Sequence, residues 1–361
     1  MFVGSVQWLS QHLATLIWPR RPRPDLGAFA LPPEIILMVA KYLTNASTIS
    51  LALTCRTLHN LCFPHHTHLN TAEKEELLLL LESDLATHHF CHYCTKLHLW
   101  HLPWDYFLDP WPEVHLPCDP HLSRNWLRVG FACYLPYHQA RLVMNRHLYG
   151  TKHGLPLRVL EKRISFKCPS RRVTYSESLH ARLVDNELLV LSVRTISHSR
   201  GDAKELRDYV ESWGHPGCKH LTLEKGVLNY VPVQLPELVK GKTTHGHFAP
   251  CDQSFGSCPL CLTDYCIDIS WRGERKGHSI KVSVYRQLGD CRSPFGWSWR
   301  SMTSLQTLEE PRTANPLEYR PGCVRDRWNK AEGIESRTQS EWVELPDDLS
   351  RFVQEPACSV M

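Results

Sequence analysis

The sequence has little net charge, no long hydrophobic run and no regular repeat. Its 361 residues include 41 Lys and Arg against 37 Asp and Glu, and the resulting charge of +4 is too small to indicate a nucleic-acid partner. The absence of a Gly-x-y period, of sustained heptads and of repeats of about 20–50 residues excludes collagen, coiled-coil and solenoid architectures. An apolar share of 42% nevertheless suffices for a buried core, so we expect about two to three compact domains.

Residues 1–19 lack charged side chains, yet they form no continuous apolar segment. Gln7, Ser10, Gln11 and His12 interrupt the stretch, which therefore fits neither a secretion signal nor a membrane-spanning helix. Its apolar residues recur at helical spacing. The sequence predicts an N-terminal helix and a Pro/Arg linker over residues 1–30, with the helix either packed on the next domain or lying on a membrane surface.

Several catalytic motifs are missing as well. The chain has no H-E-x-x-H, G-x-S-x-G or G-x-G-x-x-G pattern. The segment Gly241-Lys242-Thr243 resembles the end of a phosphate-binding loop, but Pro236 stands where the first glycine of that loop belongs. We therefore nominate no catalytic residue and expect no enzyme activity from this chain.

Histidine and cysteine are abundant, with 22 and 15 residues respectively. The chain is long and its number of cysteines is odd, which is not typical of a small disulfide-stapled secreted domain. We expect reduced thiols in the cytoplasm or nucleus, some of them ligating structural zinc.

Two Cys-x-x-Cys pairs predict these zinc sites, because two thiolates at that spacing can bind one Zn²⁺. The first pair is Cys91 and Cys94, and its preferred partners are Cys118 and Cys133, with His98 and His121 as alternatives. The second pair directly precedes a predicted hairpin. It consists of Cys258 and Cys261, with Cys218 and His220 as the preferred partners and His245, His247, Cys251 and Cys266 as alternatives.

Residues 31–63 read as three short helices. Pro32 and Pro33 suit a first helical turn. The predicted inner face of the first helix consists of Ile35, Val39 and Leu43, with Met38 and Tyr42 alongside. Ser47 is the predicted N-cap of the second helix. Three helices within about 35 residues can hardly bury a core alone, so we expect this unit to share its apolar surface with a partner.

The segments Leu31-Pro32-x-Glu34-Ile35, Tyr42-Leu43 and Leu51-Ala52-Leu53-x-Cys55-Arg56 resemble an F-box. Ser47-Thr48 stands where that family usually has Asp-Leu. The resemblance implies a three-helix unit that docks on the Skp-type adaptor of a cullin–RING ubiquitin ligase. The adaptor-binding residues it implies are Leu31, Pro32, Ile35, Leu51 and Leu53.

Three later segments follow the F-box: Cys91-x-x-Cys94-x-x-Leu97-His98, Leu142-Val143-Met144-Asn145-Arg146-His147 and Cys258-x-x-Cys261-x-Thr263-Asp264. Together with the F-box they are similar to a group of fungal F-box proteins. This resemblance implies a substrate-recognition subunit of an SCF-type ligase, with an unknown protein target. The alternative is a zinc-stabilised interaction module that acts outside a ligase. The sequence ends in Cys358-Ser359-Val360-Met361, a Cys-a-a-X form, so Cys358 is a candidate for lipidation, although no polybasic run precedes it. A single lipid would give only weak membrane contact.

The remaining pattern predicts helices over 72–85, 138–149 and 202–213, and hairpins over 182–193 and 265–284. The fold class is therefore α+β: an N-terminal three-helix F-box followed by a Cys/His-rich α+β domain with β-hairpins. The predicted domains are the helix and linker (1–30), the F-box (31–66), a helical Cys/His-rich region (67–150), a β-rich zinc-stapled domain (151–302) and a flexible polar tail (303–361).

Overall fold

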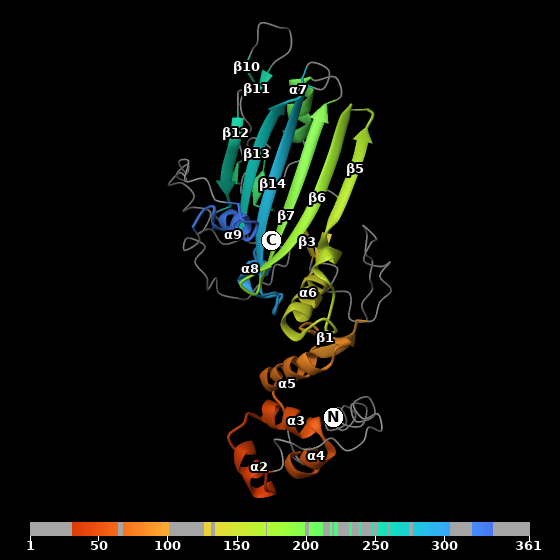
Figure 1. Cartoon of the computed structure of the whole chain (residues 1–361), viewed down its shortest axis with the longest axis vertical. Coiled ribbons are helices and arrows are strands. Elements are labelled where there is room, and N and C mark those ends of the chain that lie inside the picture. Colours follow the sequence, from red (N-terminus) through yellow and green to blue (C-terminus); the bar gives the residue numbers. More distant parts are fainter. Residues whose placement is uncertain are drawn as a thin grey trace, which may run out of the picture. The chain divides into compact units, whose positions relative to one another are not determined.

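The chain forms two compact units, Met1–Trp100 and His101–Met361. The computed structural model describes residues 31–63, 68–100, 126–130, 134–170, 172–198, 202–211, 217–218, 220–222, 231–232, 238–239, 247–248, 251–258, 260–273, 277–303 and 320–334 (Figure 1). The predicted helix and linker over 1–30, the loop-like segment Gly241-Lys242-Thr243 and the lipidation candidate Cys358 lie outside these residues.

The first unit is mainly helical. Its described elements are α2 (Pro33–Ala40), α3 (Asn45–Thr54), α4 (Arg56–Cys62), α5 (Thr71–Asp84), β1 (His88–Cys91) and β2 (Lys96–Leu99). A capping box between Asn70 and Glu73 begins α5. The N-cap prediction for α3 is wrong by three residues. The Thr44 side chain accepts the Ser47 amide at 3.1 Å, which places Ser47 inside the first turn.

Two small apolar clusters form the core of this unit. One joins α3 to α5 and the other joins α2 to α3 and α4; their buried members are Ala46, Ile49, Leu77 and Leu81, and Ile36, Ala52, Leu58 and Cys62. The predicted inner face of α2 is wrong, because Ile36 is the buried residue of this helix while Ile35, Val39 and Leu43 are exposed. Apolar residues fill nearly every position of α2, so their spacing did not define one inner face.

The β1–β2 hairpin belongs to the first unit. It packs on α5, where the buried Glu82 carboxylate accepts the Phe90 amide at 2.8 Å, and the Trp100 indole donates to the Ala86 carbonyl at 2.9 Å. The predicted region 67–150 therefore divides at Trp100. Its later helix, α6 (Tyr137–Tyr149), packs instead on strands of the second unit.

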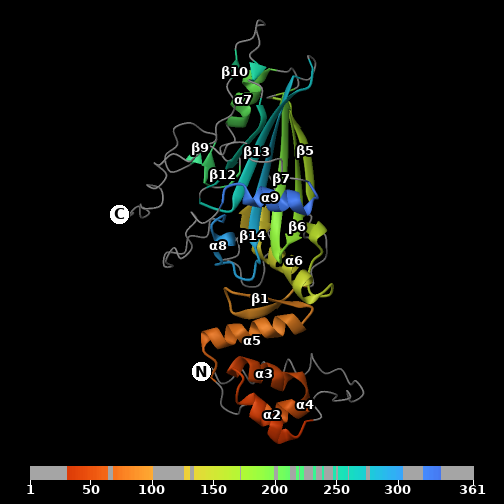
Figure 2. The same ribbon diagram turned by 60° about the vertical axis from the view of Figure 1, so that its left-hand side comes forward.

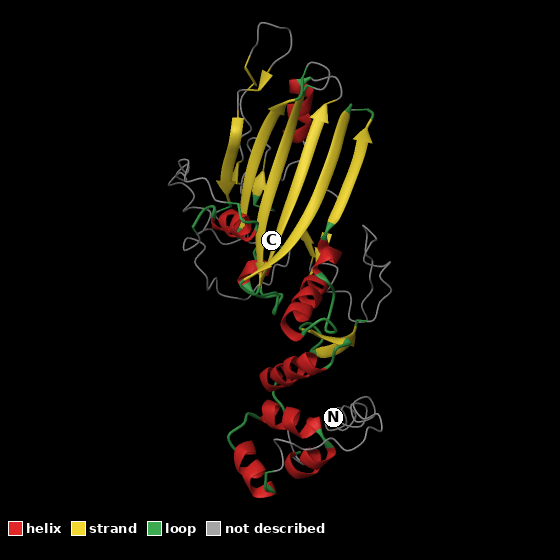
Figure 3. Ribbon diagram, in the orientation of Figure 1, coloured by secondary structure: helices red, strands yellow, loops and turns green. Residues whose placement is uncertain are grey.

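The second unit is built on an antiparallel sheet in the order β12-β13-β14-β7-β6-β5, the largest sheet in the described part of the chain (Figure 3). Its strands are β5 (Lys162–Cys168), β6 (Val173–Val184), β7 (Glu187–His198), β12 (Cys251–Ser257), β13 (Thr263–Trp271) and β14 (His278–Gly289). Both predicted hairpins are confirmed, as β6–β7 and β13–β14. Asp185 and Asn186 turn the first hairpin with φ of 52° and 61°, values that Asn and Asp tolerate well.

The second unit also contains smaller elements. They are β3 (Trp126–Arg128), β4 (Tyr134–Pro136), the 3₁₀ turn Leu157–Leu160, α7 (Ala203–Glu211), β8 (Leu221–Thr222), β9 (Val231–Pro232), β10 (Leu238–Val239), β11 (His247–Phe248), α8 (Trp297–Arg300) and α9 (Cys323–Ala331). The predicted helices over 72–85, 138–149 and 202–213 correspond to α5, α6 and α7. None of the described helices combines the length and apolar character that crossing a bilayer requires.

Helix α9 lies inside the predicted flexible polar tail (303–361), so that prediction is wrong for residues 320–334; residues 304–319 and 335–361 lie outside the described residues. The helix lies across β13, β14 and β6 (Figure 2) and buries Trp328 against Leu189 and Leu191. The buried Asp264 carboxylate accepts the amides of Gly322 at 3.1 Å and Arg325 at 2.9 Å, which fixes the N-terminal end of α9. Few apolar residues anchor this helix, so its polar composition is the same as that of a loosely ordered segment and the sequence did not predict it.

Candidate docking surface and metal centres

The first unit carries an exposed apolar surface along α2 and the turn that follows it. Seven of the eleven exposed large apolar side chains in the described part of the chain lie between Leu31 and Leu43. Met38 is 55% exposed and Tyr42 is 89% exposed. We call this the α2 surface; its members are Leu31, Ile35, Leu37, Met38, Val39, Tyr42 and Leu43. Exposed apolar side chains concentrated in one short segment indicate an interaction site.

The predicted adaptor-binding residues divide into two groups. Leu31, Pro32 and Ile35 are exposed and lie on or beside the α2 surface. Leu51 and Leu53 are half-buried, and each packs against one of the two core clusters of the unit. Met38 and Tyr42 were predicted to lie beside the inner face of this helix, not to bind an adaptor, and that placement is wrong because both are exposed. The run of apolar residues in α2 could have indicated this exposure, because so short a helix cannot bury all of them.

The second unit brings together Cys218, His220, Cys258 and Cys261, the preferred set around the second Cys-x-x-Cys pair. Their ligand atoms all lie within 4.8 Å of one another, and the three cysteines are buried. The His220 Nδ1 atom is 3.6 Å from Cys218 Sγ and 3.5 Å from Cys258 Sγ. Among the alternatives, Cys266 lies on β13 beside Asp268, whereas His245 and the side chains of His247 and Cys251 are outside the described residues.

A tight turn before β13 positions two of these thiols. The Cys258 amide donates to the Thr263 carbonyl at 2.8 Å, and the Thr263 amide donates to the Cys261 carbonyl at 2.7 Å. The Leu260 amide donates to Cys258 Sγ at 3.4 Å, a contact that stabilises a thiolate. The backbone therefore directs both sulfur atoms to the same point.

The thiols of this cluster differ in their affinity for protons. Burial raises the pKa of Cys258 and Cys261 well above the ordinary value, and the adjacent Cys218 raises both further. Burial also acts to raise the pKa of Cys218, but hydrogen bonds from Cys258, Cys261 and His220 outweigh it and hold that pKa well below the ordinary value. A thiolate among buried thiols is a ready cation ligand, and a bound cation would displace the remaining protons.

A second group of metal-ligating atoms lies in the β1–β2 hairpin of the first unit. Cys91, Cys94 and His98 place their ligand atoms within 4.8 Å of one another, with 2.9 Å between Cys94 Sγ and His98 Nε2. In the hairpin, Cys91 on β1 pairs with Lys96 on β2, and Cys94 lies in the turn between them. This pairing brings β2, which carries His98, alongside Cys91. The preferred partners Cys118 and Cys133, and the alternative His121, lie outside the described residues.

Comparison with known proteins identifies the helical part of the first unit. Residues 28–68 match the family model described as F-box-like, and the match includes α2, α3, α4 and the whole α2 surface. No curated protein and no solved structure matched the chain. The chain therefore carries an F-box-like domain, while the resemblance of its later part to fungal F-box proteins stays a prediction.

Proposed function

We propose that this protein is a substrate-recognition subunit of an SCF-type ubiquitin ligase, in which the α2 surface docks on the Skp-type adaptor. The exposure of Leu31, Ile35 and Met38 within the F-box-like match is the observation that carries the proposal. Covering these side chains with a partner removes apolar surface from water, the main driving force of most protein association.

The second unit would bind the degradation target, and catalysis would belong to the other subunits of the ligase. The contribution of this chain is proximity, because holding a target near the ubiquitin-loaded enzyme raises its effective concentration. The proposal needs no reacting residue in this chain.

We further propose that the metal in both clusters is structural zinc. Sulfur and imidazole donors without a carboxylate suit zinc rather than calcium or magnesium. Three thiols and one imidazole in the Cys218 cluster complete a tetrahedral set, which leaves no open position for a reacting water.

Co-purification tests the docking. In full-length protein, Ile35→Asp and Met38→Asp should each abolish capture of the Skp-type adaptor and, with it, of the cullin. Leu99→Asp is the matched control, because Leu99 is an exposed apolar residue of the same unit outside the α2 surface. Capture that survives both α2 variants would refute the docking assignment. Capture of the adaptor without the cullin would favour a zinc-stabilised module that acts outside a ligase.

A further inference from the structure

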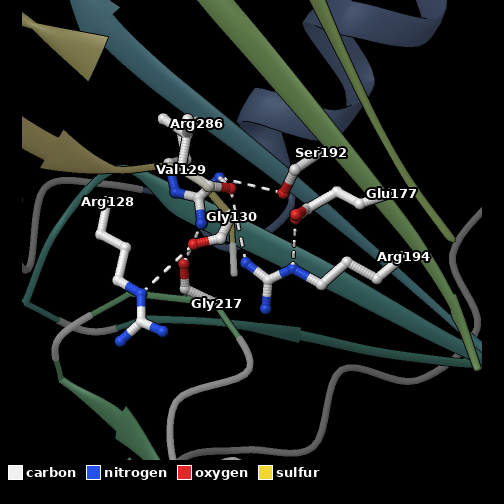
Figure 4. Close-up of polar contacts among 8 residues, drawn as sticks. All are labelled: Arg128, Val129, Gly130, Glu177, Ser192, Arg194, Gly217 and Arg286. Atoms are coloured by element: carbon white, nitrogen blue, oxygen red, sulfur yellow. Dashed lines mark hydrogen bonds and ion pairs between the residues drawn. The ribbon is translucent and has the colours of Figure 1, made fainter. Parts of the chain in front are cut away.

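A buried cation lies beside the Cys218 cluster, and among the described residues it has no carboxylate as a hydrogen-bond partner. Arg286 of β14 is fully buried, and its Nη1 donates to the Val129 carbonyl at 3.3 Å and to Ser192 Oγ at 3.2 Å (Figure 4). Its Nη2 donates to the carbonyl of Gly217. All these acceptors are neutral oxygens, and Nε finds no acceptor among the described residues.

The neighbouring arginine is different. Arg194 of β7 pairs with the buried Glu177 carboxylate at 2.8 Å, so these two side chains are together neutral. Arg286, Arg194 and Glu177 together therefore carry a net charge of +1 beside the Cys218 cluster. Burying an unpaired charge is strongly unfavourable, so a nearby negative charge is required to balance it.

The Cys218 cluster can supply that negative charge. Gly217, which accepts a hydrogen bond from Arg286, directly precedes Cys218 in the chain. Burial and the charge of Arg194 lower the pKa of Arg286, while Cys218, Cys261 and Glu177 raise it; the net pKa is about 10, so the guanidinium is protonated at neutral pH. Three thiolates and one neutral imidazole around a divalent cation carry a net charge of −1.

We infer that Arg286 is the counter-charge of a divalent metal–trithiolate centre formed by Cys218, His220, Cys258 and Cys261. The inference rests on the proposed metal centre and is independent of adaptor docking. Binding of the cation completes the charge balance of the core, so the metal and Arg286 stabilise each other. By linkage, losing either one weakens the contribution of the other.

Zinc release from the loaded, full-length protein tests this inference. Arg286→Gln removes the charge but keeps hydrogen-bond donors, whereas Arg286→Lys keeps the charge; both lose the planar guanidinium fork. In competition with a chelator, Arg286→Gln should lower the zinc affinity of the Cys218 centre on the order of 10–100-fold, and Arg286→Lys should retain most of it. Arg292→Gln is the control, because Arg292 bonds Asn145 and Tyr149.

Cobalt serves as the spectroscopic probe. Sulfur-to-cobalt charge-transfer bands of the same shape in wild type and in Arg286→Gln would show that the donors are unchanged and that affinity alone has fallen. The rise in melting temperature on adding zinc should also be smaller for Arg286→Gln.

Equal affinities for wild type, Arg286→Gln and Arg286→Lys would overturn the inference about Arg286 but would not contradict the proposed metal centre. Loss of affinity in both variants would assign the effect to the guanidinium fork and would also overturn it. If wild type shows no thiolate bands that depend on Cys258 and Cys261, the proposed metal centre itself is wrong.

Discussion

The two units carry opposite departures from the ordinary distribution of side chains. The first unit leaves apolar residues such as Met38 and Tyr42 in water, while the second buries the cation Arg286 among neutral oxygens. Each arrangement is unfavourable in the isolated chain. Each also becomes favourable with one kind of partner: a protein surface that covers the α2 surface, and a metal–thiolate centre that balances the buried charge. The exposed apolar side chains of the first unit therefore indicate a protein partner, and the buried cation of the second unit indicates a metal–thiolate centre.

The largest expected effect follows loss of the metal ligands in the second unit. Cys258→Ser or Cys261→Ser should abolish metal binding at the Cys218 centre and unfold the surrounding region, because binding to structural zinc sites releases on the order of 10 kcal/mol. Metal content by mass spectrometry and circular dichroism melting would measure both losses. Cys168→Ser is the control, since Cys168 lies on β5 outside both clusters. Variants that lose metal but melt like wild type would contradict a structural role.

Two adjacent residues of α2 separate docking from folding. Ile36→Ala should destabilise the first unit by about 2–4 kcal/mol, because it opens a cavity in a packed cluster. Ile35→Ala should change that stability by about 0.5 kcal/mol or less, because the side chain is exposed, but it should weaken adaptor binding. Urea unfolding and calorimetric titration with the adaptor would measure the two effects. If Ile35→Ala destabilised the unit and Ile36→Ala did not, our description of α2 would be wrong.

Acid should weaken the second unit through His138 of α6. Burial lowers the pKa of His138 to about 4, whereas the unfolded chain has the ordinary value of 6.5. Between pH 4 and pH 6.5 the unfolded chain binds more protons than the folded chain. The contribution of His138 to the free energy of unfolding is therefore fully present above pH 6.5, and the free energy falls by up to about 3 kcal/mol as the pH drops to 4. His138→Leu should remove this part of the pH dependence in urea unfolding. The exposed His180 provides the control variant His180→Asn, and an unchanged slope in His138→Leu would contradict the assignment.

The smallest effect concerns the attachment of α9. Asp264→Asn keeps the shape of the side chain but removes the negative charge at the N-terminal end of α9, which should cost about 1 kcal/mol. Unfolding monitored by tryptophan fluorescence would report the change because Trp328 lies on this helix. Asp268→Asn is the control, because Asp268 is half-buried on the same strand and pairs with Lys281 at 3.8 Å.

Sequence reasoning succeeded where local patterns determine the structure. Alternation with turn residues located both hairpins, and the second Cys-x-x-Cys pair with Cys218 and His220 anticipated a cluster that the fold brings together. It failed where tertiary packing chooses between equal local alternatives. Ile35 and Ile36 are both apolar, and the packing of α3 and α4 against α2 decides which of them is buried.

Arg286 interrupts the apolar face of a buried strand. Ile280, Val282, Val284 and Arg286 occupy successive positions on one face of β14, so the buried face of that strand passes through a charged residue. The sequence could signal this conflict, but the carbonyls that surround the guanidinium come from distant segments. The role of Arg286 therefore emerged only from the folded structure.

Hydrogen–deuterium exchange on the full-length protein, with and without purified Skp-type adaptor, tests the central claim most directly. Our account predicts binding with protection from exchange concentrated in residues 31–43 and little change in the second unit. Binding that leaves residues 31–43 unprotected, or no binding at all, would contradict it.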